Sequence, residues 1–189
     1  MTEGISRKMN RGWTTRDIMV TSIISVTLGV IYIPLTYVVG WSMTVPFAYA
    51  LMMGIYFWPI IMVAYLIRKP GAALYSALVT SIVQVPFTPY GVTALLNIVG
   101  IGLPVEIILL VSRYRNFKTW YLMLTGIVCA MVNGILYFIM LGLVNSPPEL
   151  QIIYFMEFMI GGAIFGGFLA KIIGDVVIKS GAIPSISGE

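Results

Sequence analysis

Six long apolar stretches separated by short polar turns restrict what this chain can fold into. They run approximately over 17–39, 44–67, 72–85, 92–112, 119–144 and 152–178. A helix needs about 20 mostly apolar residues to cross a bilayer. Five of the stretches reach that length, and the third is shorter because sequences rich in helix breakers, RKPG and PFTPYG, bound it. We therefore predict an all-α integral membrane protein, a single domain of six transmembrane helices.

The composition agrees with a membrane protein and excludes several kinds of chemistry. Hydrophobic residues make up 59% of the chain and charged residues 10%, whereas a soluble domain is about half apolar and a quarter charged. Histidine is absent and Cys129 is the single cysteine, so neither an intrachain disulfide nor a metal site of imidazoles or paired thiolates is possible. We predict no metal, no cofactor and no enzymatic activity. The sequence also lacks a phosphate-binding G-x-x-x-x-G-K-[ST] loop, so ATP hydrolysis would require another chain.

The positions of the basic residues predict the orientation in the membrane. Every lysine and arginine lies in the N-terminal segment 1–16, at 68–69, in the turn 113–118, or towards the end of the last apolar stretch. The alternate loops, at 38–46, 86–91 and 145–151, contain no basic residue. Because basic residues mark the cytoplasmic side, we predict that both termini are cytoplasmic. This pattern also accounts for the net charge of +4 without nucleic acid, and it suits a multi-pass protein of a bacterial cell membrane.

The outer loops contain aromatic residues beside several prolines. Trp41 lies in the first outer loop, and Phe87 and Tyr90 lie in the second. One interpretation is the aromatic belt that membrane proteins place at the lipid–water interface. The other is a structured lid over an outward-facing pocket.

Polar side chains within the outer halves of four helices predict a ligand site. They are Glu157, Tyr154, Asn97, Tyr137, Asn133 and Gln84. Polar groups at membrane depth are costly, face the bundle interior and often mark function. A carboxylate among aromatic rings would suit a flat, cationic or amino-substituted heteroaromatic ligand. A buried structural network of the same residues is the alternative.

Glu106 is expected to lie apart from this group. It follows Asn97 by nine residues, about 900° of helical rotation, and therefore belongs to the opposite helix face. We predict a structural or partner-facing role for Glu106.

Small residues recur every four positions in the first and last helices. Thr21, Ser25 and Gly29 form such a stripe in the first helix. In the last helix the stripe consists of Gly162, Gly166, Ala170 and Gly174. This spacing lets another helix approach closely. We interpret the last-helix stripe as packing within the bundle, whereas the first-helix stripe suits either internal packing or a partner protein.

Several local sequences resemble the S components of energy-coupling factor (ECF) vitamin transporters. They are GWTTRDI at 12–18, FWP at 57–59, YFMEF at 154–158 and GGAIFGG at 161–167. Within that family they resemble S components linked to thiamin and its hydroxymethylpyrimidine precursor. The resemblance covers nearly the whole chain.

The resemblance implies a substrate-capture subunit that works with a transmembrane coupling protein and ATPase subunits. In the family, later helices hold the substrate near the outer face, and the loops after helices one and three cap it. Those loops correspond to the ones with Trp41 and with Phe87 and Tyr90. Helix one of the family docks on the coupling protein through an Ala-x-x-x-Ala pattern, which Thr21, Ser25 and Gly29 replace here.

Three alternatives stay open from the sequence. A secondary transporter could couple protons through Glu157 and Glu106, although no internal repeat supports the inverted-repeat folds. A small membrane enzyme would lack a catalytic pair or metal set. An S component could also serve another vitamin, such as riboflavin.

Overall fold

The computed structural model describes residues 12–42, 44, 48–140 and 142–181. Over these residues the chain is helical and contains no strand. The elements in chain order are α1 (Thr15–Ser42), α2 (Ala48–Met52), η1 (Met53–Tyr56), α3 (Trp58–Ile67), α4 (Ala72–Gln84), η2 (Gly91–Leu96), η3 (Ile98–Gly102), α5 (Leu103–Val111), α6 (Thr119–Met140), η4 (Leu143–Asn145), α7 (Pro148–Gly161), η5 (Gly162–Phe168) and α8 (Leu169–Lys179).

These elements join into the six apolar segments that the sequence predicts. Five helical segments are long and apolar enough to cross a membrane, and α4 is the short sixth segment. Three of the six are composite: α2–η1–α3, η2–η3–α5 and α7–η5–α8. Proline lacks a backbone N–H, and in two of these segments an α-helix restarts with a proline in its first turn, Pro59 in α3 and Pro104 in α5. The prediction of an all-α membrane bundle is confirmed.

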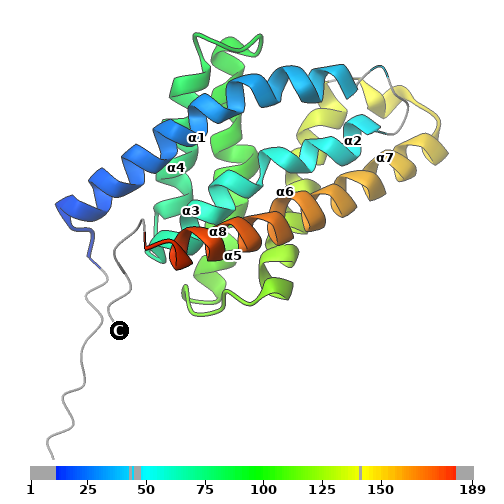
Figure 1. The fold of residues 1–189 in the computed structure, drawn as a ribbon. Helices are drawn as coiled ribbons and strands as arrows, with labels where there is room; N and C mark the ends of the chain where they lie inside the picture. Colours follow the sequence, from blue (N-terminus) through cyan, green and yellow to red (C-terminus); the bar gives the residue numbers. More distant parts are fainter. Residues whose placement is uncertain (1–11, 43, 45–47, 141, 182–189) are drawn as a thin grey trace, which may run out of the picture.

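The segment α2–η1–α3 is the centre of the bundle. Every residue of α3 is buried. Figure 1 shows α2 and α3 running between α1 on one side and α7–α8 on the other. The outer helices instead direct many exposed apolar side chains outwards, such as Ile23 on α1 and Ile139 on α6. This distribution is what a lipid-surrounded bundle requires, because lipid solvates apolar side chains while the core excludes it.

Glycines bring the last segment into backbone contact with its neighbours. A Cβ atom on Gly126 of α6 would lie 1.9 Å from the carbonyl oxygen of Gly162 in η5. A Cβ on Gly54 would lie 2.1 Å from the backbone of Gly161. Small residues at these positions are needed because the helix backbones touch. The internal packing predicted for the last-helix stripe is confirmed, since Gly166 also packs on Phe57.

The small-residue stripe of α1 is covered by α4. Thr21 and Ser25 are fully buried, and the Ser25 hydroxyl donates a hydrogen bond to Ser76 Oγ at 3.1 Å. A Cβ on Gly29 would lie 2.8 Å from the Cβ of Val83. Because α4 occupies this face, a partner protein has no access to these three residues. Their placement supports the packing alternative and speaks against docking through this stripe.

The basic clusters gather at one end of the bundle, which we call the basic end. Lys69 forms a salt bridge with Asp17 and donates to the Gly12 carbonyl at 2.9 Å. Arg68 lies over the Phe117 ring, 5.1 Å from its centroid. Lys171 lies 4.6 Å from the centroid of the Tyr65 ring. The described chain also begins and ends at this end (Figure 1).

Glu106 has a structural role at the basic end. Its carboxylate is buried and accepts hydrogen bonds from the backbone N–H groups of Gly71, at 2.7 Å, and Ala73, at 3.3 Å. These N–H groups open α4, where a helix has no internal acceptors. An acidic side chain there also interacts favourably with the helix dipole. Glu106 therefore caps α4 from the neighbouring helix α5.

Candidate functional site

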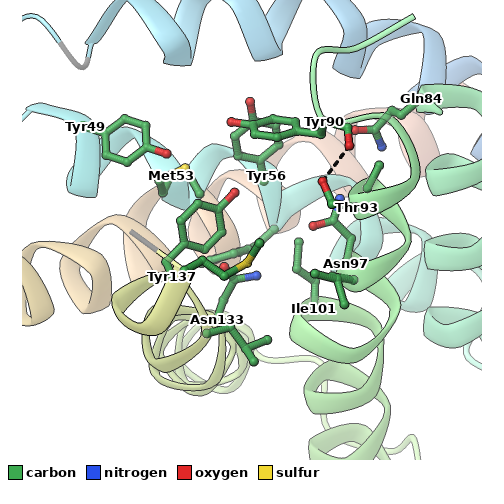
Figure 2. Close-up of a pocket in the computed structure, with 15 residues that line it drawn as sticks. Tyr49, Met53, Tyr56, Gln84, Tyr90, Thr93, Asn97, Ile101, Asn133 and Tyr137 are labelled. Atoms are coloured by element: carbon green, nitrogen blue, oxygen red, sulfur yellow. Dashed lines mark hydrogen bonds between the residues drawn. The ribbon is translucent and has the colours of Figure 1, made fainter. Parts of the chain in front are cut away.

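A pocket of about 190 Å³ opens at the end of the bundle opposite the basic end. It lies between the α2–η1 region, the end of α4, the irregular helix η2–η3 and the C-terminal half of α6. The polar side chains that line it are Tyr49, Tyr56, Gln84, Tyr90, Thr93, Asn97, Asn133 and Tyr137. Figure 2 shows these side chains around a common space. The volume is sufficient for a small ring compound, far more than the space one water molecule needs.

The irregular helix η2–η3 makes room for an amide on the pocket wall. Gly100 lies within its π-helical turn, and a Cβ at this position would meet Asn133 Nδ2 at 2.8 Å. Only glycine therefore lets the Asn133 amide pack here without displacement. π-Helical turns of this kind are frequent at functional sites.

Three polar atoms of the pocket lining are buried without a hydrogen-bond partner in the protein. They are the hydroxyls of Tyr49 and Tyr56 and the Oδ1 atom of Asn133. An unpaired buried polar group costs about 1–3 kcal/mol. Other pocket groups are already engaged: Gln84 Nε2 donates to the Thr80 carbonyl at 3.1 Å, and Thr93 Oγ1 donates to the Tyr90 carbonyl at 2.6 Å. The three unpaired atoms are thus available to a ligand.

Aromatic contacts behind the pocket hold two of its tyrosines. The Tyr56 ring stacks on Tyr32 with centroids 5.7 Å apart and planes 7° apart, and the Tyr32 hydroxyl donates to the Tyr56 carbonyl. The Tyr137 ring packs on Phe158 of α7 with centroids 6.2 Å apart. Four tyrosines line the pocket and none of its lining residues is charged. Such a site suits a flat aromatic ligand, because tyrosine faces stack on rings and attract cations.

The structure brings five of the predicted site residues together. Asn97, Asn133, Tyr137, Gln84 and Tyr90 all line the pocket. Their convergence from α4, the 85–90 loop, η2–η3 and α6 brings the predicted polar layer together at one site. It does so without a carboxylate.

The other four predicted residues lie outside the lining. Glu157 is half-buried on α7, and its Oε2 atom is buried without a hydrogen-bond partner. Tyr154 lies one turn earlier on α7 and packs against the core cluster. Trp41 is 84% exposed and Phe87 is 59% exposed. Such exposure agrees with the interpretation that these two aromatic residues belong to an interfacial belt. They do not form a closed lid over the pocket in this conformation.

The sequence did not predict the pocket residues that come from the segment α2–η1–α3. Tyr49, Met53 and Tyr56 line the pocket from α2 and η1. Their spacing of four and then three residues places them on one helical face. That spacing is the sequence feature that could have indicated a shared face. Tyrosine and methionine are equally common in an apolar core, so the pattern alone does not distinguish a pocket wall from core packing.

Comparisons with known proteins relate this chain to membrane transport components. The family model for the permease component of ABC-type cobalt transport systems matches residues 16–132, more than half of the chain. A curated relative is the "Putative HMP/thiamine permease protein YkoE" of Bacillus subtilis (strain 168). It is 30% identical over 178 residues, which cover 92% of this chain and 88% of the relative.

A solved structure described as the crystal structure of an S-component of an ECF transporter superposes with a TM-score of 0.84. It is 28% identical and the match covers 90% of this chain and 88% of that one. The chain belongs to the S-component family of ECF transporters. It is thus a multi-pass membrane transport component, and its relatives are transporters rather than enzymes. The S-component fold also implies a small-molecule ligand and partners in an ECF module.

Proposed function

We propose that this S component captures thiamin or its hydroxymethylpyrimidine moiety in the pocket. The observation that carries the proposal is the set of three unpaired polar atoms, Tyr49 Oη, Tyr56 Oη and Asn133 Oδ1, on one uncharged aromatic lining. The name of the B. subtilis relative, an HMP/thiamine permease, supports the choice of ligand.

The chemistry of an aminopyrimidine complements these atoms. Its exocyclic amine is a hydrogen-bond donor, which an amide oxygen such as Asn133 Oδ1 accepts. Its ring nitrogens and a hydroxymethyl oxygen are acceptors, which the hydroxyls of Tyr49 and Tyr56 satisfy as donors. The tyrosine faces stack on the ring and attract a positive charge, if the ligand carries one. In this proposal Asn97, Gln84, Tyr90 and Tyr137 shape the remaining surface of the pocket.

The proposed direction of transport is inward, with the pocket at the outer face and the basic end in the cytoplasm. Support comes from the basic clusters, which meet at one end of the bundle, and from the rule that such clusters are cytoplasmic. Reporters fused at 113–118 and at the C-terminus should give cytoplasmic signals, and a reporter in the 86–91 loop should give an external one. An external signal at either basic position contradicts the orientation.

In this proposal, uptake is driven by ATP hydrolysis in separate subunits of an ECF module. The described chain offers no group of metal ligands and no nucleotide-binding motif. The alternative of a proton-coupled transporter finds weaker support, because Glu106 is engaged by backbone N–H groups at the basic end, away from the pocket.

Two experiments test the proposal. Mass spectrometry of ligand that co-purifies with the subunit should identify thiamin or hydroxymethylpyrimidine, and calorimetric titration should show tight binding of the same compound but not of riboflavin. In vesicles, uptake should require the coupling protein and ATPase subunits. Uptake by the chain alone under a proton gradient, or tight binding of riboflavin, would reject the proposal.

A further inference from the structure

The basic end contains a second pocket, which we call the basic pocket. Four cationic side chains line it: Arg68 at the end of α3, Arg115 and Lys118 in the 113–118 turn, and Lys171 on α8. Segments far apart in the sequence thus place like charges around one open concavity. Like charges repel one another, so such an arrangement is favourable chiefly when an anion binds among them.

Only part of this charge is neutralised within the described chain. Asp175 binds Lys171 at 2.5 Å and accepts a hydrogen bond from the Tyr65 hydroxyl at 2.6 Å. No carboxylate of the described residues forms a salt bridge with Arg68, Arg115 or Lys118. Four cations and one carboxylate leave an excess of three positive charges around the pocket.

Arg68 is held in a fixed position without losing its charge. Its guanidinium lies 5.1 Å from the centroids of both the Tyr65 and Phe117 rings, and its Nε donates to the Tyr65 carbonyl at 3.2 Å. Cation–π contacts orient a guanidinium but leave most of its N–H donors available. A guanidinium oriented in this way suits the bidentate binding of a phosphate.

The beginning of α6 adds polar donors to the same pocket. Thr119 lines the pocket and is the first residue of this 22-residue helix. The backbone N–H groups of Tyr121 and Leu122 donate to the Lys118 carbonyl, at 2.9 Å and 3.1 Å. The donors of this helix end nearest the pocket are therefore the N–H groups of Thr119 and Trp120. A helix N-terminus favours negative charge. Cations, a hydroxyl and the helix dipole therefore act on the same small volume.

Apolar side chains beside the pocket indicate where the anion comes from. Trp120, the neighbour of Thr119, is 57% exposed, and Ile172, the neighbour of Lys171, is 44% exposed. Phe168 and Val176 continue the exposed apolar face of the same segment at 44% and 61%. An exposed tryptophan next to basic residues is typical of the membrane interface. A phosphate in the pocket would have lipid-facing surface on both sides for acyl chains.

We propose that the basic pocket binds the phosphate group of an anionic phospholipid. Basic pockets between transmembrane helices at the cytoplasmic surface recognise such headgroups. The site is separate from the first pocket and would anchor the end of α3, the start of α6 and the first turn of α8 in the leaflet. The proposal does not depend on the identity of the transported ligand.

Native mass spectrometry of the delipidated full chain tests the proposal. Titration with phosphatidylglycerol should show one bound lipid per chain, with a markedly higher affinity than phosphatidylcholine shows in the same titration. The double variant Arg115→Gln, Lys118→Gln should weaken phosphatidylglycerol binding about 25-fold, because each basic residue near the surface contributes roughly fivefold. Lys179→Gln is the matched control, since Lys179 is a basic residue of α8 outside the pocket lining and should have little effect.

A variant with the opposite sign sharpens the test. Asp175→Asn removes the one carboxylate that neutralises Lys171 and should strengthen phosphatidylglycerol binding a few-fold. Thermal unfolding in detergent checks that each variant folds. The proposal is overturned by equal binding of the two lipids, by an equal loss in Lys179→Gln, or by saturable binding of inorganic phosphate that abolishes the preference for phosphatidylglycerol. The last result would assign the pocket to a soluble anion.

Discussion

The carboxylates at the basic end of this bundle and three buried polar atoms of the pocket at the other end differ in their hydrogen bonding. At the basic end the carboxylates are engaged: Asp17 by Lys69, Asp175 by Lys171, and Glu106 by two backbone N–H groups. At the other end, the pocket contains two tyrosine hydroxyls and an amide oxygen without a partner. A paired group stabilises the fold, whereas an unpaired group costs folding energy unless a ligand completes it.

The difference separates residues that maintain the scaffold from residues that recognise a ligand. Residue type does not make this separation, since acids, amides and tyrosines occur at both ends. For the carboxylates of the basic end and the three unpaired pocket atoms, hydrogen-bond pairing makes it. Substitutions at the basic end should therefore change stability and leave ligand affinity unchanged, and substitutions of the unpaired pocket groups should do the reverse.

The largest effect is expected for Glu106→Leu. The substitution leaves the N–H groups of Gly71 and Ala73 without their acceptor, at about 1–3 kcal/mol each. Thermal unfolding in detergent should show a loss of several degrees or more, while calorimetry on the folded protein should show unchanged ligand affinity. Glu149→Leu, at an exposed acid in the first turn of α7, is the control: it should lose at most about 1 kcal/mol of stability, from the helix dipole, and leave affinity unchanged. A loss of affinity without a loss of stability would contradict the assignment of Glu106 to the scaffold.

Asn133→Leu should produce the largest loss of ligand affinity. Leucine has a similar shape, but it removes the acceptor proposed for the ligand amine, and a donor left unpaired in the complex costs about 1–3 kcal/mol. Affinity should fall about ten- to a hundredfold. Stability should be equal or higher, because the substitution removes a buried oxygen that has no partner in the free protein. A variant that binds like the parent would show that Asn133 does not contact the ligand.

The sequence predicted the architecture well for a physical reason. Membrane helices must bury their own backbone hydrogen bonds and expose apolar side chains to lipid, so apolar length alone reveals them. The basic clusters also predict which helix ends lie on the same side of the bundle, and in the structure Lys69, Arg68 and Lys171 are at one end. The predicted site residues that line the pocket are amides and tyrosines at one depth, such as Asn97. They could be predicted because the depth of a residue in the membrane follows from its position along a helix.

What the sequence did not provide is the rotation of each helix about its axis. Glu157 was placed at the same depth as the pocket residues, but its side chain on α7 is not part of the lining. Tyr49 and Tyr56 face the pocket because α2 and η1 form the centre of the bundle, a result of packing rather than of local pattern. The stripe of α1 likewise has an intrachain partner, α4, that only the tertiary structure reveals; Ser25 contacts Ser76.

Removing single tyrosine hydroxyls should give smaller effects of the same sign. Tyr49→Phe and Tyr56→Phe each delete one neutral hydrogen bond to the ligand, and affinity should fall about two- to tenfold without a loss of stability. Tyr121→Phe is the matched control, because the Tyr121 hydroxyl donates to the Ile108 carbonyl at 2.5 Å outside the pocket. The control should lose about 2–4 °C of thermal stability and no affinity. If the three variants behave alike, pairing within the protein does not distinguish the two ends.

Among the substitutions at the pocket end, the smallest change in affinity is expected for Glu157→Gln, which tests whether depth along a helix or rotation about its axis decides a residue's role. Glu157 is the carboxylate that sequence reasoning assigned to the ligand, yet it does not line the pocket, and its Oε2 atom is buried against the protein without a partner. Glutamine keeps the shape and removes the charge. Calorimetry with thiamin and hydroxymethylpyrimidine should therefore show affinities within about threefold of the parent, an effect smaller than one neutral hydrogen bond. A loss of ten- to a hundredfold would instead place the carboxylate in the complex, and would require α7 to rotate or shift towards the pocket when the ligand binds.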